Sequence, residues 1–332
     1  MKAVSLFSGG LDSILATRLI ADQGIDVEAL YFKTVFWGKY DDKINRLVLE
    51  KSASQAKAKL SILDVNKEYF DVVKNPAHGY GKNLNPCIDC KIFILKTAKE
   101  YMKKTGSSFL VTGEVLGQRP MSQHRSILGE IERSSGASGI IVRPLTAKLF
   151  KESIPEQRGW IDREKLLAIE GRSRKPQLAL AKKYGIEDFP NPAGGCLLAD
   201  KIFSDKMRDI IKHEKDFEVN DIDLIKNGRV FRISPEAKLI IGRNEKQNSL
   251  LVGLMRNQDY SFEPVDIPGP IGIGRGRFDE DMINTAASVV ARYSDTEPGR
   301  EVSILCKECA GGKERLIKVS PATEERTISL RV

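Results

Sequence analysis

The sequence predicts an α/β protein in which a parallel β-sheet, covered by helices on both faces, is followed by a smaller α+β domain. Three features of the chain support this expectation. Short apolar runs alternate with helical patterns through the first half, as in parallel sheets with crossover helices. The glycine pair Gly9-Gly10 joins the first apolar run to the first helical pattern. The regular alternation ends near residue 205.

The elements of the first domain follow from these patterns in chain order. Apolar runs predict strands at 2–7, 27–33, 61–65, 108–112 and 139–143. Helical patterns predict helices at 11–22, 41–59 and 91–104, and a basic, largely helical stretch over 145–190. Ligands of parallel sheets bind beyond the carboxyl ends of the strands, so we expect the functional site at that edge.

The second domain is expected to begin at 200–206, which divides the chain into residues 1–204 and 205–332. Helical patterns cover 205–213, 245–255 and 279–293. Apolar runs predict strands at 228–233, 237–242, 302–306 and 315–319, and the glycine-rich segment "GPIGIGRGR" predicts a loop. This mixture is typical of a small α+β domain.

Length and charge restrict the class of protein. The chain has 332 residues, enough for two domains, and a net charge of +8. The charge is about +9 in the first 204 residues and about −1 in the rest, and a positive surface favours polyanions such as nucleic acids. No segment reaches the roughly 20 apolar residues of a membrane span, and no signal-peptide pattern opens the chain. We therefore expect a cytoplasmic protein without membrane interactions.

The junction "SGGLDS" (residues 8–13) is the first candidate site. Its glycines permit a tight turn that points successive N–H groups into one concavity, and the following helix start attracts anions. The hydroxyls of Ser8 and Ser13 can donate hydrogen bonds to phosphate oxygens. Asp12 would repel a bare phosphate, so it requires either a bound Mg²⁺ or a helix-capping role. An ordinary capped strand–helix turn remains the alternative at this point.

Neither G-x-x-x-x-G-K-[ST] nor G-x-G-x-x-G is present in this loop. "SGGLDS" instead resembles the pyrophosphate loop (PP-loop) of the N-type ATP pyrophosphatases, which split ATP to AMP and pyrophosphate. The resemblance implies a HUP-like domain that binds ATP and Mg²⁺, and it places the adenine near Tyr31 and Phe32. Core packing is the alternative role for these two rings. The expected nucleotide-binding residues of the loop are Ser8, Gly9, Gly10, Leu11, Asp12 and Ser13.

Five cysteines occur as Cys87-x-x-Cys90, Cys196 and Cys306-x-x-Cys309, an odd number that argues against a disulfide framework. "NPCIDCKIF" resembles the cysteine loop of tRNA 2-thiouridylases. "VTGEVLGQRPMSQ" resembles the tRNA 4-thiouridine synthetase family, which adds Gly113 and Glu114 to the expected nucleotide site. "GGCLL" is similar to the second cysteine loop of both families.

The resemblance also implies the chemistry of the cysteines. Cys87, Cys90 and Cys196 supply three thiolates, as in the iron–sulfur-dependent branch of tRNA thiolases, and three thiolates leave one iron of a 4Fe–4S cluster open. Structural zinc and two-cysteine persulfide chemistry are the alternatives. We expect thiolates at neutral pH, because a helix start or metal lowers a thiol pKa.

These motifs predict an ATP-dependent tRNA sulfurtransferase that forms 4-thiouridine. ATP would adenylate a uridine carbonyl with the help of Asp12. Sulfur from the cluster, or from a persulfide on Cys90 or Cys196, would then displace AMP, with sulfide or a cysteine desulfurase as the sulfur donor. The alternatives are a tRNA 2-thiouridine synthase, an amide- or nitrile-forming adenylating enzyme with structural zinc, and a non-catalytic RNA-binding protein.

Two segments are candidates for tRNA binding. The basic segment before "GGCLL" contains Arg172, Arg174 and Lys175, with a solvated helix face as the alternative. "LIIGRNEKQNSLL" resembles the NFACT RNA-binding domain, and the matching polar residues are Arg243, Asn244, Lys246 and Gln247. Arg275 and Arg277 are expected to face phosphates. A four-cysteine site built on the last cysteine pair would require a second copy of the chain, so a homodimer is an open alternative.

Overall fold

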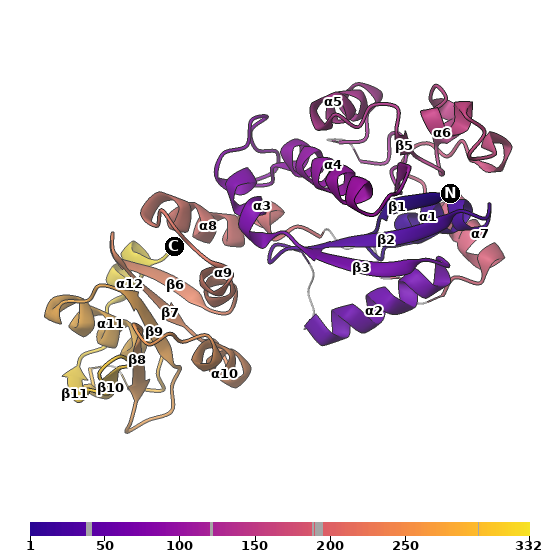
Figure 1. Ribbon diagram of the computed structural model, residues 1–332. Helices are drawn as coiled ribbons and strands as arrows, with labels where there is room; N and C mark the ends of the chain where they lie inside the picture. Colours follow the sequence, from indigo (N-terminus) through magenta and orange to yellow (C-terminus); the bar gives the residue numbers. More distant parts are fainter. Residues whose placement is uncertain (38–41, 120–121, 188, 190–194, 298) are drawn as a thin grey trace. The chain divides into compact units, whose positions relative to one another are not determined.

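The computed structural model describes residues 1–37, 42–119, 122–187, 189, 195–297 and 299–332. The chain forms two compact units, Met1–Ala199 and Asp200–Val332 (Figure 1). In the described part, no helix has the length and apolar character needed to cross a bilayer.

The first unit contains a five-stranded parallel sheet in the order β3-β2-β1-β4-β5. Its strands are β1 Lys2–Leu6, β2 Asp26–Lys33, β3 Lys59–Asp64, β4 Phe109–Thr112 and β5 Ile141–Val142. The chain winds outward from β1 to β3 and then crosses to β4 on the other side of β1. The strand order therefore reverses between β1 and β4, which is where parallel sheets bind ligands. The predicted parallel sheet is confirmed.

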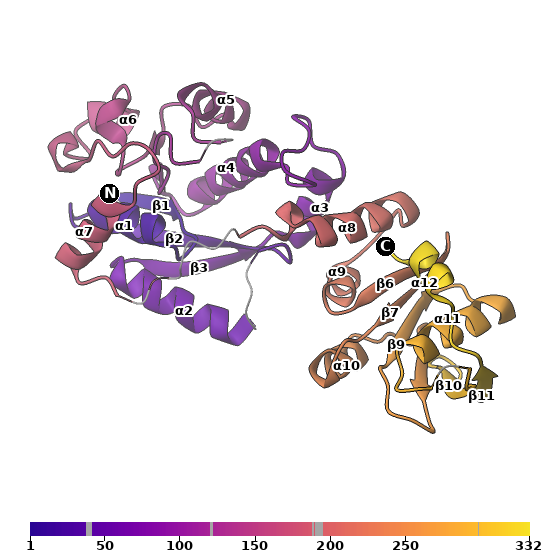
Figure 2. The same cartoon turned by 180° about the vertical axis from the view of Figure 1, so that it is seen from behind.

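Alternating residues of β1 explain the two helical layers, which Figures 1 and 2 show from opposite sides. Ala3 packs into an apolar cluster with α1 (Leu11–Ala21), and this face also carries α2 (Asp42–Gln55) and α7 (Lys175–Tyr184). Val4 packs into the opposite cluster with α4 (Cys87–Lys104) and α5 (Arg125–Ser135), beside α3 (Asn66–Lys74). Because helices cover both faces, the central strands β1 and β4 are largely buried, whereas the edge strand β3 keeps exposed residues.

The predicted largely helical stretch over 145–190 is wrong for most of its length. It contains η1 Ala147–Leu149, α6 Ile154–Gln157, η2 Arg163–Lys165 and only one longer helix, α7. Gly159 and Gly171 adopt positive φ angles of 65° and 83°, which break helical geometry between the short turns.

The second unit is built on a six-stranded antiparallel sheet in the order β11-β10-β8-β9-β7-β6. The strands are β6 Arg229–Ser234, β7 Ala237–Ile241, β8 Tyr260–Pro264, β9 Gly272–Gly276, β10 Val302–Glu308 and β11 Glu314–Val319. The helices are α8 Lys201–His213, α9 Val219–Lys226, α10 Glu245–Gly253, α11 Glu280–Arg292 and α12 Glu324–Leu330, after the turn η3 Leu197–Ala199. The predicted smaller α+β domain is confirmed.

The glycine-rich segment predicted as a loop contains strand β9. A Cβ atom on Gly272 would lie 2.6 Å from Cγ2 of Val290 in α11, and one on Gly274 would lie 2.9 Å from the ring of Phe278. These glycines therefore leave room for side chains that pack closely on the sheet, which is a recognised use of glycine inside strands.

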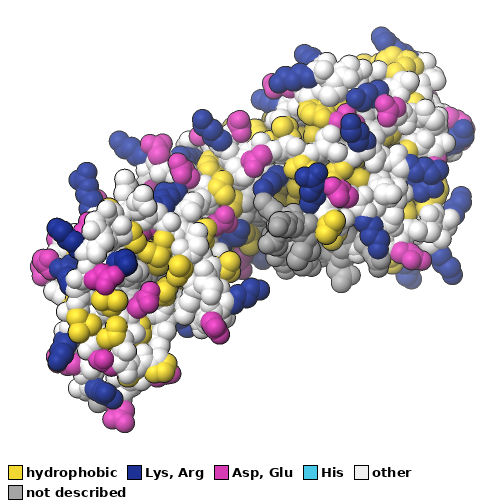
Figure 3. Space-filling model, turned by 60° about the horizontal axis from the view of Figure 1, so that its bottom comes forward, with side chains coloured by type: hydrophobic (Ala, Val, Ile, Leu, Met, Phe, Trp, Pro, Cys, Tyr) yellow, Lys and Arg dark blue, Asp and Glu magenta, His cyan; other side chains and the backbone are white. Residues whose placement is uncertain are grey.

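The charged side chains visible in Figure 3 are mixed on both units, with Lys and Arg among Asp and Glu rather than in one uniformly basic surface.

A second set of charged side chains is buried in the second unit. Lys238 and Arg275 lie opposite each other in the β7–β9 register and are 1% and 9% exposed. Their neighbour Leu239 belongs to the apolar cluster on the α11 face, so the charged pair faces the other side of the sheet.

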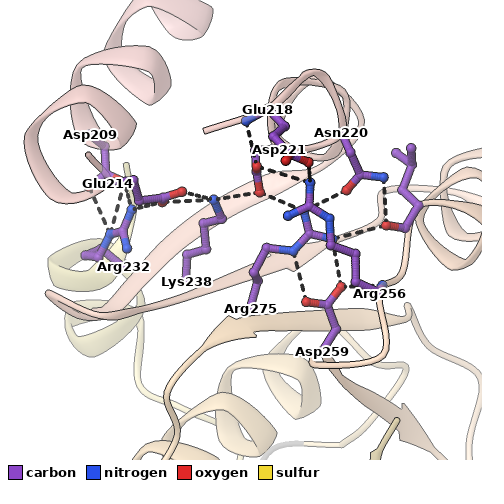
Figure 4. A network of polar contacts seen from close by, with 11 residues as sticks. Asp209, Glu214, Glu218, Asn220, Asp221, Arg232, Lys238, Arg256, Asp259 and Arg275 are labelled. Carbon is purple, nitrogen blue, oxygen red and sulfur yellow. Dashed lines mark hydrogen bonds and ion pairs between the residues drawn. The ribbon is translucent and has the colours of Figure 1, made fainter. Parts of the chain in front are cut away.

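Carboxylates from α8, α9 and the loop before β8 neutralise these cations (Figure 4). Lys238 Nζ lies 2.6 Å from Oε2 of Glu214. Arg275 contacts Asp259 and Asp221 at 2.7 and 2.8 Å. The expectation that Arg275 faces phosphates is therefore wrong, because its guanidinium is buried in a network of internal ion pairs. The side chain of Arg277 is 89% exposed.

Candidate active site

The loop after β1 is held closed by its own polar groups. The Ser13 hydroxyl donates to Gly10 O over 2.7 Å and accepts a hydrogen bond from Ser8 N over 3.3 Å. Gly9 has a φ of +73°, and a Cβ atom there would lie 2.9 Å from Cδ2 of Leu49. Leu11 is buried in the core and anchors the first turn of α1. These contacts together hold the loop in a closed turn.

Two motifs that are distant in sequence meet at the point where the strand order reverses. A Cβ atom on Gly113, directly after β4, would lie 2.7 Å from the carbonyl carbon of Asp12 and 2.8 Å from the nitrogen of Ser13. Gln118 Nε2 donates to Oδ2 of Asp12 over 3.0 Å. The segment "GEVLGQ" therefore packs directly against the loop "SGGLDS".

Asp12 does not cap the helix. The N-cap residue of α1 is Gly10, and this helix start has no side-chain capping hydrogen bond. The second carboxylate oxygen, Oδ1, is buried without a hydrogen-bond partner among the described residues. An orphaned carboxylate oxygen beside an anion-binding loop suits a Mg²⁺ ligand, since Mg²⁺ is bound by one or two carboxylates plus phosphates. Asp12 therefore fits the Mg²⁺ that the loop implies.

Glu114 joins this region to the cysteine helix. Its carboxylate forms ion pairs with Lys91, the residue after Cys90 in α4, and with Arg143 Nε at 3.0 Å. Lys91 Nζ also donates to Ser122 O over 3.2 Å. Burial would raise the pKa of Glu114, but the cations Lys91 and Arg143 lower it to about 2. Glu114 is therefore charged at neutral pH and is a structural link rather than a proton donor.

The two rings expected near the adenine lie in different environments. Phe32 is 4% exposed and belongs to the apolar cluster between the sheet and α4. Tyr31 is half-buried on the alternate face of β2. The core-packing alternative therefore describes the position of Phe32, whereas Tyr31 retains accessible surface.

The two cysteine loops of the first unit come together beside the end of β2. Cys87 and Cys90 lie in the first turn of α4. Cys196 forms an isolated antiparallel bridge with Trp37, and Leu197 N donates to Phe36 O over 3.1 Å. The three thiols are close enough for the charges of Cys196 and Cys87 to influence the pKa of Cys90. The structure thus brings together the three cysteines that the sequence singled out.

The expectation of thiolates at neutral pH is wrong for the metal-free chain. Loss of solvation raises the pKa of Cys90 to about 12 and that of Cys196 to about 11. It also raises the pKa of Cys87, against the opposing charges of Lys91 and Arg119. Desolvation penalises the charged form of a thiol, and here it outweighs the helix start at Cys87.

The surroundings of the three thiols bear on which metal group they could hold. The hydroxyl of Tyr69 lies beside Cys90 and lacks a well-formed hydrogen bond within the described residues. No group of three His, Cys, Asp or Glu side chains in this part of the chain is placed to hold a metal ion. Cysteine thiolates are soft ligands of the kind that both zinc sites and iron–sulfur clusters use. In donor type the three cysteines therefore fit either metal group.

The basic segment lies next to "GEVLGQ". Gly171 N donates to Leu116 O over 2.8 Å, which places the start of this segment beside the nucleotide motif. Arg172 and Lys175 are exposed. Arg174 is half-buried, and its Nε has no hydrogen-bond partner within the described ranges.

The residues expected to bind RNA in the second unit have two kinds of role. Asn244 caps α10, because its Oδ1 accepts from Gln247 N over 3.0 Å. Gln247 Oε1 accepts from Arg243 N, also over 3.0 Å. These two amides therefore shape the loop, whereas the side chains of Arg243 and Lys246 are exposed.

The last cysteine pair does not form a site. Cys306 is 2% exposed and packs in the apolar core of the second unit, and Cys309 is half-buried after the end of β10. Neither thiol therefore offers the exposed pair that a four-cysteine site shared with a second copy would require.

Sequence reasoning missed Lys91, Arg143 and the contact made by Gln118. Gln118 lies inside the matched motif, so its identity was visible but its partner was not. Lys91 and Arg143 carry no motif signal, and they come to Glu114 only through the packing of α4 and the end of β5.

Comparison with known proteins gives two family-model matches, which cover different parts of the chain. Residues 1–159 match the family model described as thiamine biosynthesis protein (ThiI). Residues 228–330 match the model of the NFACT protein RNA binding domain.

Curated relatives include the tRNA-specific 2-thiouridylase MnmA of Stutzerimonas stutzeri. It is 23% identical over 305 residues, which make up 80% of this chain and 78% of the relative. A probable tRNA sulfurtransferase of Lachnospira eligens is 29% identical over 117 residues, but the match spans only 29% of that relative.

A solved 4-thiouridine synthetase–RNA complex with bound ATP is 22% identical, with a TM-score of 0.40. It covers 55% of this chain, and the match spans 40% of that structure. The U34-tRNA thiolase NcsA from Methanococcus maripaludis, solved with its [4Fe-4S] cluster, is 16% identical, with a TM-score of 0.33 and coverages of 63% and 66%. The family models and curated relatives therefore make the first 159 residues similar to the PP-loop tRNA thiouridine synthetases, and residues 228–330 similar to NFACT RNA-binding domains.

Proposed function

We propose that this protein is an ATP-dependent tRNA sulfurtransferase that replaces a uridine carbonyl oxygen with sulfur and forms 4-thiouridine. One observation carries the proposal: the PP-loop and the cysteines belong to one connected set of contacts. Asp12 packs on Gly113 and bonds to Gln118, and the adjacent Glu114 pairs with Lys91, next to Cys90. A site that both activates a base and delivers sulfur needs these two centres in one unit.

The activation step uses the loop after β1. Its N–H groups and the start of α1 would hold the phosphates of ATP, and Asp12 would hold Mg²⁺. The uridine oxygen attacks the α-phosphorus, and pyrophosphate leaves with its charge neutralised by these groups. The carbonyl oxygen, a poor leaving group by itself, then departs as part of AMP.

The sulfur step would use Cys87, Cys90 and Cys196. These residues would hold a 4Fe–4S cluster, which when bound supplies sulfur to the activated base. The high pKa values of Cys90 and Cys196 disfavour free thiolates in the metal-free chain, so direct attack by a cysteine thiolate is unfavourable. A bound metal deprotonates its ligating thiols, and for this reason we prefer the cluster route. A persulfide on Cys90 or Cys196 is the competing route.

The tRNA would enter beside the basic segment. Arg172 and Lys175 are exposed next to the nucleotide motif, where they would position the RNA backbone while the target base leaves its stack. Arg243 and Lys246 would contribute contacts from the NFACT-type domain. Sulfide or a cysteine desulfurase would act as the sulfur donor, and the cytoplasm is the expected compartment.

The test is reconstitution with protein purified without oxygen. ATP, unmodified tRNA transcript and sulfide are added, pyrophosphate release is followed, and the tRNA nucleosides are analysed by mass spectrometry. We expect 4-thiouridine together with iron and acid-labile sulfide in the protein. A 2-thiouridine product would favour the second candidate, which the long match to MnmA supports. Pyrophosphate release without any thionucleoside would overturn the sulfur-transfer proposal.

A further inference from the structure

Four cations gather around the first residues of β6 in the second unit. Arg229 opens this strand, and Arg331 forms an isolated bridge with Phe231 of the same strand. Arg243 follows two residues after β7, whose last residue Ile241 pairs with Arg229. Lys206 comes from α8. Segments from four parts of the chain therefore bring positive charge to one end of the sheet.

Specific contacts fix the positions of these side chains. Arg229 Nη1 donates to Gly242 O over 3.2 Å, which ties its guanidinium to the loop that carries Arg243. The same guanidinium lies over the ring of Tyr293, 4.6 Å from its centre. Lys206 is buried, and its Nζ donates to Ile225 O and Gly228 O over 2.8 and 2.7 Å.

These cations differ from three other cations of the same sheet in their ion pairing. Arg232, Lys238 and Arg275 each form ion pairs with carboxylates (Figure 4). Across the described ranges, neither Arg229, Arg243 nor Arg331 forms an ion pair with a carboxylate. The domain thus neutralises one set of cations internally and leaves the other without an anionic partner.

The cations of this cluster also act on each other. Burial, together with the charges of Arg243 and Arg331, lowers the pKa of Lys206 to about 8, against the opposing charge of Asp200. Burial likewise lowers the pKa of Arg229, with the same two arginines adding to the effect. Mutual repulsion of this kind is relieved when an anion binds between the groups.

We propose that Arg229, Arg243 and Arg331 form a binding site for a backbone phosphate of RNA. Arg243 and Arg331 are exposed and Arg229 is half-buried, so the three guanidinium groups can reach a phosphate from solvent, whereas Lys206 adds charge from beneath. Guanidinium groups match phosphate oxygens in geometry as well as charge. The proposal deepens the proposed function, since it rests on tRNA being the RNA that the protein binds.

The experiment compares two double variants of the full chain. Arg243→Gln with Arg331→Gln removes the two exposed members of the cluster. Arg300→Gln with Lys313→Gln removes the same charge from exposed positions elsewhere in the unit. The affinity for tRNA transcript is measured without ATP at several KCl concentrations, and circular dichroism checks that both variants are folded.

We expect the cluster variant to bind tRNA about tenfold more weakly and its slope of log K against log[KCl] to fall by roughly 0.9 for each lost phosphate contact. The control should retain both values. The proposal would be overturned if both variants lost the same tRNA affinity or if the cluster variant kept its affinity. It would also be overturned if the cluster variant showed a higher KM for ATP with unaltered tRNA binding. A wild-type protein that binds tRNA through this cluster but forms no thionucleoside would refute the proposed function alone.

Discussion

Gln118 donates its side-chain amide to the carboxylate of Asp12 over 3.0 Å, although the two residues are 106 positions apart in the chain. This bond orients one oxygen of Asp12 and leaves the other without a partner in the described part of the chain. The contact thus fixes the orientation of the carboxylate beside the loop after β1, and it offers a direct test of the proposed site.

Replacing Gln118 with Leu should lower the rate of tRNA-dependent pyrophosphate release about tenfold to a hundredfold, because a misoriented metal ligand loses affinity and activity to that extent. The KM for Mg²⁺ should rise. The control Gln157→Leu removes an exposed amide that donates to Glu152 O, and it should leave turnover intact. Equal activity of the two variants would show that Gln118 does not position Asp12.

Replacing Gly113 with Ala should abolish ATP turnover. The added methyl group would come within 2.8 Å of three backbone atoms of Asp12 and Ser13, and backbone cannot move aside without displacing the loop. Gly129→Ala is the matched control, because its nearest neighbour would be a flexible arginine tip at 3.5 Å in the middle of α5. Isotope exchange between pyrophosphate and ATP measures the effect, and normal exchange in the Gly113 variant would contradict the packing argument.

Replacing Cys196 with Ala should remove both the bound iron and thionucleoside formation while leaving the affinity for ATP within about twofold. The reason is that Cys196 comes from a loop beside Trp37 and not from the PP-loop. Cys309→Ala provides the control, since that residue is half-buried in the other unit. Iron analysis and nucleoside mass spectrometry report the result. Full thiolation by the Cys196 variant would reject its role.

Replacing Glu114 with Gln should lower the free energy of unfolding by about 3 kcal/mol at pH 7, because Lys91 would lose its carboxylate partner and Arg143 would keep only Glu132. The pKa of Glu114 falls from an ordinary 4.5 to about 2 on folding. The charged carboxylate therefore stabilises the fold fully above pH 4.5, and this contribution disappears as the pH falls towards 2.

Urea titrations of both proteins test this prediction. The difference in unfolding free energy between wild type and the Glu114→Gln variant should shrink as the pH drops below 4.5. Glu130→Gln, which removes an exposed pair with Arg133, should leave the stability nearly unchanged at every pH. A difference that stays constant from pH 7 to pH 3 would contradict the ion-pair assignment.

Much of the first unit could be predicted from periodicity, because buried parallel strands produce continuous apolar runs and all five predicted strands occur in the sheet. The prediction failed where local signals were weak. Strand β9 is rich in glycine, and its stability comes from its neighbours and α11 rather than from strand-forming residues. The short turns within 145–190 are likewise determined by tertiary contacts.

The candidate site, like the fold, could be predicted only in part from the sequence. Motif spacing identified the PP-loop and the three neighbouring cysteines, because those residue types carry the chemistry themselves. Protonation of the cysteines depends on how deeply the fold buries them and on Tyr69 and Trp37, which no local pattern reports. The internal pairing of Arg275 with Asp221 and Asp259 was equally invisible, because its partners come from separate loops and helices.

The close packing of Gly113 on Asp12 has a consequence for protein engineering. The loop of residues 8–13 cannot be transplanted into another scaffold by itself, because the segment that follows β4 packs against it and completes its geometry. A functional graft must carry residues 8–13 and 113–118 together, and chimeras that exchange only one of them will be inactive for steric reasons even when every ligand-contacting side chain is present.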